Sequence, residues 1–584
     1  FQLFENMRIG SNKNYYTSVP WVQNSINQNW YFIQPDNKTL HLGDGLMTAY
    51  ADRVDYLHAR VFSDPRSLWR AQFWSLPANT PNTNHKFIKL LYKDFTAPAV
   101  TRPDLPLNWW SDKVGLSVSR SSWNNDAVMV SFFNSPSKRS DHEHRDNNSF
   151  TVFKNAPLLI DAGHYDTYAG THYRNYYQRT IAHNSICVFD SAETFRNFGL
   201  PASNDGGQIE SMSLANYNDI FLPQNQRGKW ILYGTGTAYS YSVADAQLSY
   251  DSTKLSLFRR RLLYLKPDKV IVLDHVHLKN RATRQRSVKW IGHFANMPVL
   301  NGSFTHIQIP GHIETANGNS YTARNGNGSI AIKTILPTSS TVTRIGGSGY
   351  EYWVNGLNYP PLSPPDSNYY TPGKWRIEVQ PVTESDTVVF LHNISVGDST
   401  RIAVAGGTVL ESAFTIGTDW SDTLYLFGAD GNVNKSYHLV ENINGGRTIG
   451  IFAADLAEGA YYIKKNNIIE TTVSTDNNGI LQTSLTLETG MHKLEIVSVT
   501  TGIRNPSNPI PVSVYPNPAN NYLTIQLPPA NQPVQVNIFD AKGSLVLNKV
   551  NQLNINISGL TAGTYFIEII RAGKLFRSSF IKGR

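Results

Sequence analysis

Cysteine is almost absent from the sequence. Cys187 is the only one among 584 residues, so the chain cannot form an internal disulfide. It lies in the apolar run "SICVFD", and we expect it to be a buried residue of a β-strand. Because exported bacterial proteins can also lack disulfides, this shortage leaves the cellular compartment open.

Long hydrophobic runs and nucleic-acid motifs are absent too. No apolar stretch approaches the ~20 residues of a transmembrane helix. The formal net charge of +8 favours an acidic partner, namely nucleic acid, an anionic lipid surface or an anionic polysaccharide, although it also fits mild solubilising charge. Since no basic arm, P-loop or zinc finger is present, nucleic acid is the least favoured of the three.

The sequence opens "FQLFENMRIG", with neither an initiator methionine nor a signal peptide. We therefore expect a processed or truncated product. Its length predicts three or four domains. Aromatic residues are plentiful, with 12 Trp, 30 Tyr and 26 Phe, which is typical of proteins that stack on sugar rings and also of β-rich folds.

Helical patterning is convincing only in the first hundred residues. In "GLMTAYADRVDYLHARVF" the apolar residues Tyr50, Val54, Leu57 and Val61 keep helical spacing. A second helix is predicted from "SDPRSLWRAQFW", with Ser63 or Asp64 as its N-cap. Two helices alone cannot bury their apolar faces. We therefore expect that they pack on the next domain or that they are the last part of a larger helical domain.

From about Leu107 the pattern changes to short β-runs separated by Asn, Gly, Ser and Pro. We predict a mainly β protein: a helical segment over 1–106, a large antiparallel β-sandwich over 107–395, and a second, smaller β region over 396–500. A Pro- and Asn-rich linker over 501–513 then precedes an immunoglobulin-like β-sandwich over 514–584. Within the large sandwich, Lys266-Pro267-Asp268 predicts a hairpin turn.

The last segment resembles the C-terminal sorting domain of the Bacteroidetes type IX secretion system. The matching features are Tyr515-Pro516-Asn517-Pro518, the Asp540/Gly543 hairpin, Gly559-Leu560 and Gly563-Thr564-Tyr565. The resemblance implies export across the outer membrane, docking on the secretion machinery and often cleavage of this domain, so the protein would be secreted or bound at the cell surface. An ordinary terminal immunoglobulin-like module is the alternative.

Five of the 16 histidines lie between Asp141 and Asp190: His142, His144, His164, His172 and His183. His144, Asp161 and His183 form a candidate metal set, since two imidazoles and one carboxylate suit Zn²⁺ with water or another group in the fourth position. A cupin-like site would place Glu at Asn148 or Ser149, so that template fails. A purely polar surface strand would explain the alternating His and Asp residues, but it would not explain the dense Tyr, Arg and His residues that follow them.

The stretches "DHEHRDNNSFTVFKNAPLLIDAG" and "NYYQRTIAHNSICVFD" resemble the β-sandwich half of heparinase II/III-like polysaccharide lyases. The resemblance covers roughly residues 30–490 and is most specific over 141–190. This family has an α/α toroid followed by a large antiparallel sandwich, with the substrate cleft between them. The helical segment of this chain would be the last part of that toroid.

The resemblance also implies site roles. It makes His144, Asp161 and His183 ligands of a structural zinc and His142 the catalytic histidine facing the cleft. It makes a sandwich tyrosine a proton donor or acceptor, for which Tyr168 and Tyr173 are both candidates, while Tyr176 is expected to pack. Arg174 and Arg179 are candidates for binding the substrate carboxylate, with a structural role as the alternative for each.

The toroid of this family supplies further catalytic groups, and the chain begins after the place where they are expected. We therefore expect the missing N-terminal toroid in the same or a separate chain, so that this chain holds half an active site. A second pair, His275 and His277, is interpreted as strand-end polarity rather than a metal site. The leading hypothesis is a secreted lyase that cleaves a uronic-acid-containing anionic glycan by β-elimination. The alternative is a non-catalytic surface glycan-binding or adhesin protein exported by type IX secretion.

Overall fold

The computed structural model describes residues 10–11, 16, 28–45, 53–68, 105–137, 142–209, 219, 222, 225–279, 284–365, 370–401, 403–499, 510–527, 534–541, 545–571 and 574–583. Within the described part of 1–106, helix α4 (Arg53–Phe62) occupies the predicted helical segment, while Tyr50 lies outside the described residues. The backbone N–H of Arg66 donates to Asp64 Oδ1 at 3.0 Å, which confirms Asp64 as the cap of the helical turn that follows.

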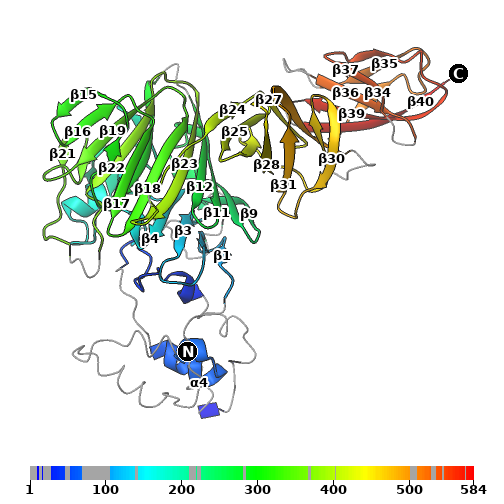
Figure 1. Ribbon diagram of the computed structural model, residues 1–584. Coiled ribbons are helices and arrows are strands. Elements are labelled where there is room, and N and C mark those ends of the chain that lie inside the picture. The colour runs from blue at the N-terminus through cyan, green and yellow to red at the C-terminus, as the bar shows by residue number, and fades with distance from the viewer. Residues whose placement is uncertain are drawn as a thin grey trace. The chain divides into compact units, whose positions relative to one another are not determined.

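The large β region contains three antiparallel sheets, coloured cyan to yellow-green in Figure 1. The first follows chain order: β1 (Asn108–Ser111), β2 (Leu116–Arg120), β3 (Val128–Phe133), β4 (Ser149–Lys154) and β5 (Ala156–Leu159). The second has the order β14 (Val299–Leu300), β17 (Ser320–Asn325), β18 (Gly328–Leu336), β23 (Thr387–Asp398), β12 (Lys269–Leu278), β11 (Leu255–Leu265), β10 (Tyr239–Asp245) and β9 (Lys229–Thr235). The third has the order β15 (Phe304–Ile309), β16 (Ile313–Ala316), β19 (Ser340–Gly346), β22 (Trp375–Pro381), β13 (Arg286–Phe294) and β6 (Ile186–Asp190).

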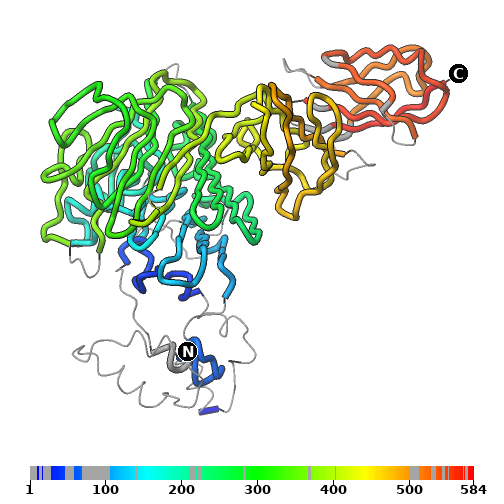
Figure 2. The backbone as a smooth tube through the Cα atoms, viewed as in Figure 1, coloured from blue at the N-terminus to red at the C-terminus, as the bar shows by residue number. Residues whose placement is uncertain are grey.

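The chain crosses repeatedly between the second and third sheets, as the backbone trace in Figure 2 shows. Inward-facing side chains of both sheets and of β3 to β5 fill one hydrophobic core, which includes Phe150, Phe258, Trp290, Ile377 and Phe390. The mainly β fold is thus confirmed. The Lys266-Pro267-Asp268 turn joins β11 to β12 as predicted.

Cys187 lies in β6 and is buried, as expected. Burial raises the pKa of its thiol well above the ordinary value. Short two-stranded sheets complete this region: β7 (Phe195–Asn197) with β8 (Leu200–Ala202), and β20 (Trp353–Val354) with β21 (Leu357–Asn358).

Three consecutive arginines in β11 form ion pairs rather than a basic surface. Alternation along the strand points Arg260 and Arg261 to opposite faces of the sheet. Arg260 pairs with Asp274, and Arg261 pairs with Asp455 of the second β region at 2.8 Å. Arg259 pairs with Asp245 at 3.1 Å. Part of the positive charge of the sequence is therefore neutralised in the interior.

The second β region consists of two sheets. One has the order β24 (Thr408–Glu411), β25 (Thr415–Trp420), β26 (Thr423–Gly428), β28 (Arg447–Ala453) and β31 (Leu481–Leu487), and the other β27 (Tyr437–Asn444), β32 (Met491–Ser498), β29 (Ala460–Lys465) and β30 (Ile468–Ser474). β26 and β28 are parallel, whereas the pairs β24–β25, β25–β26, β28–β31, β27–β32 and β29–β30 are antiparallel. Strand β23 runs through the predicted boundary at 395/396. A shared core that includes Tyr241, Leu273, Trp420 and Phe427 joins this region to the large sandwich.

The second His-x-His pair belongs to this junction. His275 is fully buried, and its Nε2 lies 3.0 Å from the carbonyl oxygen of Ala429. Burial and the neighbouring Arg261 lower the pKa of His275 to about 3, so the imidazole is neutral. The buried histidine packs the two β regions together.

Residues 498–584 form a separate compact unit. One of its sheets has the order β33 (Ile510–Pro511), β40 (Lys574–Lys582), β39 (Gly563–Arg571), β36 (Val534–Phe539) and β37 (Leu545–Val550). The other has the order β34 (Ser513–Tyr515), β35 (Tyr522–Gln526) and β38 (Asn554–Asn556). They enclose their own core, which includes Leu523, Ile538, Ile567 and Phe580. Most of the predicted linker over 501–513 lies outside the described residues. Among the helices that the structure describes, none is long and apolar enough to cross a membrane.

Candidate functional site

The described N-terminal segment 41–45 lies directly against the His-x-His stretch of the sandwich. Gly43 has a φ of +56°, and a Cβ added there would lie 2.5 Å from the carbonyl oxygen of His142. His142 itself has a φ of +56°. Only glycine therefore allows the two backbones to approach so closely at position 43.

Asp44 joins three of the side chains around this contact. Its Oδ2 accepts hydrogen bonds from His142 Nδ1 and from the Tyr173 hydroxyl, each at 2.7 Å. Its Oδ1 accepts from His144 Nε2 at 2.9 Å. Burial would raise the pKa of Asp44, but the hydrogen bonds from His144, Tyr173 and His142 together lower it below its ordinary value. The carboxylate is therefore ionised.

The candidate metal set lies behind Asp44 and is buried. His144 is 2 % exposed, Asp161 6 % and His183 0 %. The rings of His144 and His183 are 5.1 Å apart, and His183 Nδ1 lies 3.1 Å from Asp161 Oδ1. The structure thus brings together the three residues that the sequence selected, which lie up to 39 residues apart in the chain.

The hydrogen bonds fix the chemistry of His144. A carboxylate can only accept, so Nε2 carries the proton that is donated to Asp44 and Nδ1 keeps its lone pair. That buried Nδ1 has no hydrogen-bond partner among the described residues. No three described His, Cys, Asp or Glu side chains stand in the geometry of a formed metal site. The donor set nevertheless fits Zn²⁺, because a buried unprotonated imidazole beside a carboxylate and a second imidazole is its usual environment.

His41 adds a further buried group to the cluster. Its Nε2 lies 2.8 Å from the Tyr177 hydroxyl, which donates to the carbonyl oxygen of Gly43 at 3.0 Å. Burial lowers the pKa of His41 to about 4, so it is neutral. Sequence reasoning missed both His41 and Asp44. The only local signal was a polar His and Asp around Gly43 in "HLGDG", and nothing there pointed to residues about 100 positions further along.

The two candidate tyrosines have different environments. Tyr173 is completely buried in the π-helical turn η1 (Tyr173–Tyr177), and its hydroxyl also accepts from Gln178 Nε2 at 2.6 Å. Burial, together with Asp44, raises its pKa, so the hydroxyl stays protonated. Tyr168 is 49 % exposed and packs beside Phe198, with ring centres 4.7 Å apart. Of the two, Tyr168 is the one that meets solvent.

Two segments of the chain match known family models. Residues 105–341 match the family model described as heparinase II/III-like, C-terminal. The chain carries a heparinase II/III-like domain. Residues 513–582 match the secretion system C-terminal sorting domain, which confirms the resemblance of the terminal unit and indicates export. No curated protein matches the chain.

Solved structures that the chain matches include a heparan sulfate lyase and a heparinase III. The heparan sulfate lyase HepC from Pedobacter heparinus is 16% identical with a TM-score of 0.45, and the match covers 71% of this chain and 53% of that one. A heparinase III is 13% identical with a TM-score of 0.43, covering 80% and 54%. A putative mutarotase (YeaD) from Salmonella typhimurium is 14% identical with a TM-score of 0.29, covering 54% and 100%. The chain spans about half the length of HepC and of this heparinase III.

In the heparinase-like domain the two candidate arginines differ. Arg174 in η1 is half-buried, and its Nε has no hydrogen-bond partner among the described residues. Arg179 is fully buried, pairs with Asp205 and lies 4.0 Å over the Phe195 ring. A polymer cannot reach a guanidinium in that position, so the prediction that Arg179 binds substrate is wrong.

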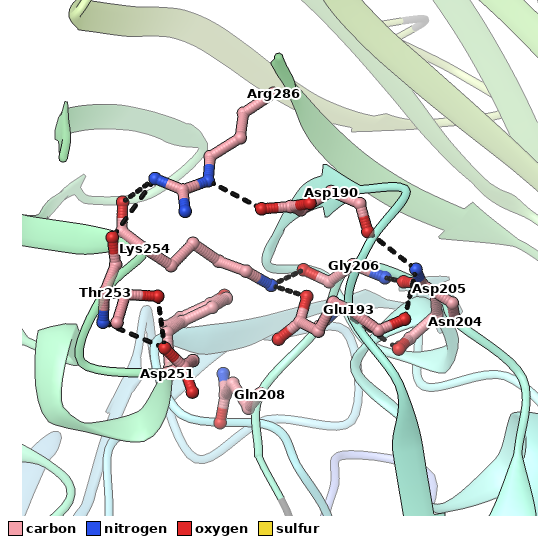
Figure 3. A network of polar contacts seen from close by, with 12 residues as sticks. Asp190, Glu193, Asn204, Asp205, Gly206, Gln208, Asp251, Thr253, Lys254 and Arg286 are labelled. Atoms are coloured by element: carbon pink, nitrogen blue, oxygen red, sulfur yellow. Dashed lines mark hydrogen bonds and ion pairs between the residues drawn. The ribbon is translucent and has the colours of Figure 1, made fainter. Parts of the chain in front are cut away.

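Arg179 instead helps to hold the turn that precedes His183, through its ion pair with Asp205. Asp205 accepts from the backbone N–H of Ile181 at 3.1 Å, in the 3₁₀ turn η2 (Thr180–Ala182). Figure 3 shows a neighbouring polar network, in which the Lys254 ammonium contacts Glu193. In the same network Arg286 Nε donates to Asp190 Oδ2 at 3.0 Å. The Asp205 contacts hold its segment against η2, and the other two ion pairs tie Asp190 and Glu193 to Arg286 and Lys254.

Proposed function

We propose that the chain is a secreted polysaccharide lyase that cleaves a uronic-acid-containing anionic glycan by β-elimination. The observation that carries the proposal is the exposed His142, anchored by Asp44, on a heparinase-like domain that also presents the exposed Tyr168. The sorting domain supports export, and we propose that it docks on the type IX secretion machinery and brings the protein to the cell surface or the medium.

The proposed chemistry follows from the protonation states. His142 donates its Nδ1 proton to Asp44, so Nε2 keeps a lone pair on a side chain that is 67 % exposed. Nε2 takes the C5 proton of a uronate residue, and the C–H electron pair forms the C4=C5 double bond. The bond from C4 to the glycosidic oxygen breaks, and that oxygen takes the hydroxyl proton of Tyr168. Arg174 supplies positive charge for the substrate carboxylate.

We further propose that His144, Asp161 and His183 hold a structural Zn²⁺. The buried Nδ1 of His144 and the adjacent Asp161 and His183 support this donor set. Bound there, the ion would supply fixed positive charge and cross-link the segments before β4, after β5 and before β6, which carry the three ligands; the elimination itself uses His142 and Tyr168. Toroid groups, in the same or a separate chain, would complete the cleft.

The activity is tested by following ultraviolet absorbance while the full-length protein is mixed with heparin, chondroitin, alginate or ulvan-type polymers. A lyase raises the absorbance because each cleavage leaves an unsaturated uronate, and a neutral glucan serves as the control polymer. Binding to one of these polymers without any rise in absorbance would instead favour the glycan-binding or adhesin function.

The zinc proposal predicts that the purified protein contains about one zinc ion per chain. His144→Ala should lose that metal and lower Tm by at least about 5 °C, because the ion stabilises only the folded state. Metal content is measured by mass spectrometry and Tm by calorimetry. His306→Ala is the matched control, since His306 is exposed on edge strand β15. Equal zinc content in both variants contradicts the ligand assignment.

A further inference from the structure

We infer that Asp44 is a positioning residue that couples the metal-ligand cluster to the catalytic histidine, an inference that rests on the proposed function. The two oxygens of its carboxylate divide the contacts. Oδ1 accepts from His144 Nε2 at 2.9 Å, whereas Oδ2 accepts from His142 Nδ1 and the Tyr173 hydroxyl at 2.7 Å. One side chain from the N-terminal segment thus touches both sets of sandwich residues.

On the metal side, Asp44 selects the tautomer of His144. Its acceptor oxygen keeps the proton on Nε2, which leaves the buried Nδ1 unprotonated in the cluster that holds Asp161 and His183. A carboxylate behind a metal-bound histidine raises the basicity of the ligand and fixes its ring, and loss of such a partner typically costs 10–100-fold in metal affinity or activity.

On the catalytic side, Asp44 orients a side chain that burial does not hold. His142 is 67 % exposed, so packing leaves its ring free to rotate. The hydrogen bond from Nδ1 to Asp44 fixes the ring and leaves Nε2 as the acceptor for the substrate proton. Tyr173 fills a remaining acceptor position of the same carboxylate and ties it to η1.

Asp44 is itself held in place by its neighbours in the segment 41–45. The carbonyl oxygen of Gly43 accepts from Tyr177, and His41 contacts the same hydroxyl. Because a side chain at position 43 would collide with the His142 carbonyl oxygen, Gly43→Ala should displace Asp44 while keeping its carboxylate. This gives a second way to break the coupling without removing a charge.

The test measures zinc release from the full chain to a colorimetric chelator. We expect Asp44→Asn to release zinc at least about 10-fold faster than the unmodified protein, because an amide has one acceptor oxygen where the carboxylate uses two to accept three donors, one of them His144 Nε2. Gly43→Ala should also speed zinc release. Asp44→Glu, which keeps a carboxylate, should release zinc at a rate between that of Asp44→Asn and that of the unmodified protein. In the absorbance assay, Asp44→Asn should lower kcat at least about 10-fold with little change in KM.

Asp166→Asn is the matched control, because Asp166 is a half-buried carboxylate that accepts from backbone N–H groups of Thr167 and Leu362. Circular dichroism checks that each variant is folded. Zinc release at the unmodified rate in Asp44→Asn overturns the inference. A protein that binds no zinc overturns it together with the metal proposal. A zinc-bound protein that forms no unsaturated product overturns the lyase proposal and, with it, the catalytic half of the inference, while the zinc-release assay still decides the metal half.

Discussion

Arg260→Leu is expected to lower the free energy of unfolding of the β-sandwich by about 3–5 kcal/mol, the usual cost of removing one partner of a buried ion pair. Arg260 is fully buried, and its guanidinium donates to both oxygens of Asp274, at 2.7 and 2.8 Å. Burial already raises the pKa of Asp274, and Arg260 is the first of the groups that oppose this shift. Without Arg260, Asp274 remains buried without its hydrogen-bonded ion-pair partner.

Arg260 makes further hydrogen bonds whose removal adds to the expected loss of stability. Its Nη1 donates to the carbonyl oxygen of Asn184 at 2.7 Å and also to that of Asn148. These carbonyl groups lie next to His183 and to strand β4, so the variant leaves two buried acceptors unsatisfied near the metal set. We therefore expect weaker zinc retention together with the lower stability.

Calorimetry and urea unfolding measure the stability of the Arg260 variants. Arg324→Leu is the matched control, because Arg324 is exposed on β17 and should change stability by less than about 0.5 kcal/mol. The double variant with Asp274→Leu should recover part of the loss, since it removes the uncompensated charge as well. A loss below about 1 kcal/mol in Arg260→Leu would show that the pair is dispensable.

His142→Asn is expected to reduce the rate of unsaturated product formation by about 10²–10⁴-fold, the usual contribution of a general base. Asparagine suits the test because, like His142, it tolerates a φ of +56°. It cannot accept the C5 proton at neutral pH. Tm should change little, because the side chain is 67 % exposed.

The same absorbance assay and calorimetry separate chemistry from folding in this series. Tyr168→Phe should also lower kcat strongly, since it removes the hydroxyl proton but keeps the ring that packs on Phe198. His306→Asn provides an exposed histidine outside the site as a control. Activity of His142→Asn within about twofold of the unmodified protein would falsify the assignment of His142 as the base.

Much of the fold was predictable because its signals are local. Short alternating runs give the strands, and the Asp64 cap and the turn at Pro267 are set by a few adjacent residues. The order of strands within the sheets was not predictable. β23 pairs with both β12 and β18, and such long-range pairings depend on core packing that a single sequence does not display.

The candidate site was predictable to a similar degree. His144, Asp161 and His183 lie in the two sequence stretches that carry the resemblance to the family, and the fold brings these three side chains together. Asp44 was missed because it lies 98 residues before His142 and has no motif of its own. Arg179 was misassigned because a charged residue in a loop gives no sign that Asp205 neutralises it in the interior.

The single buried cysteine has a practical consequence. Cys187 is 1 % exposed and has a raised pKa, so its thiol is expected to be inert to alkylating reagents in the folded protein. One engineered cysteine on the surface would then be the sole site of labelling. Thr171 is exposed at the start of the segment that carries Tyr173, and a fluorophore attached through Thr171→Cys would report glycan binding beside the site without further changes to the chain.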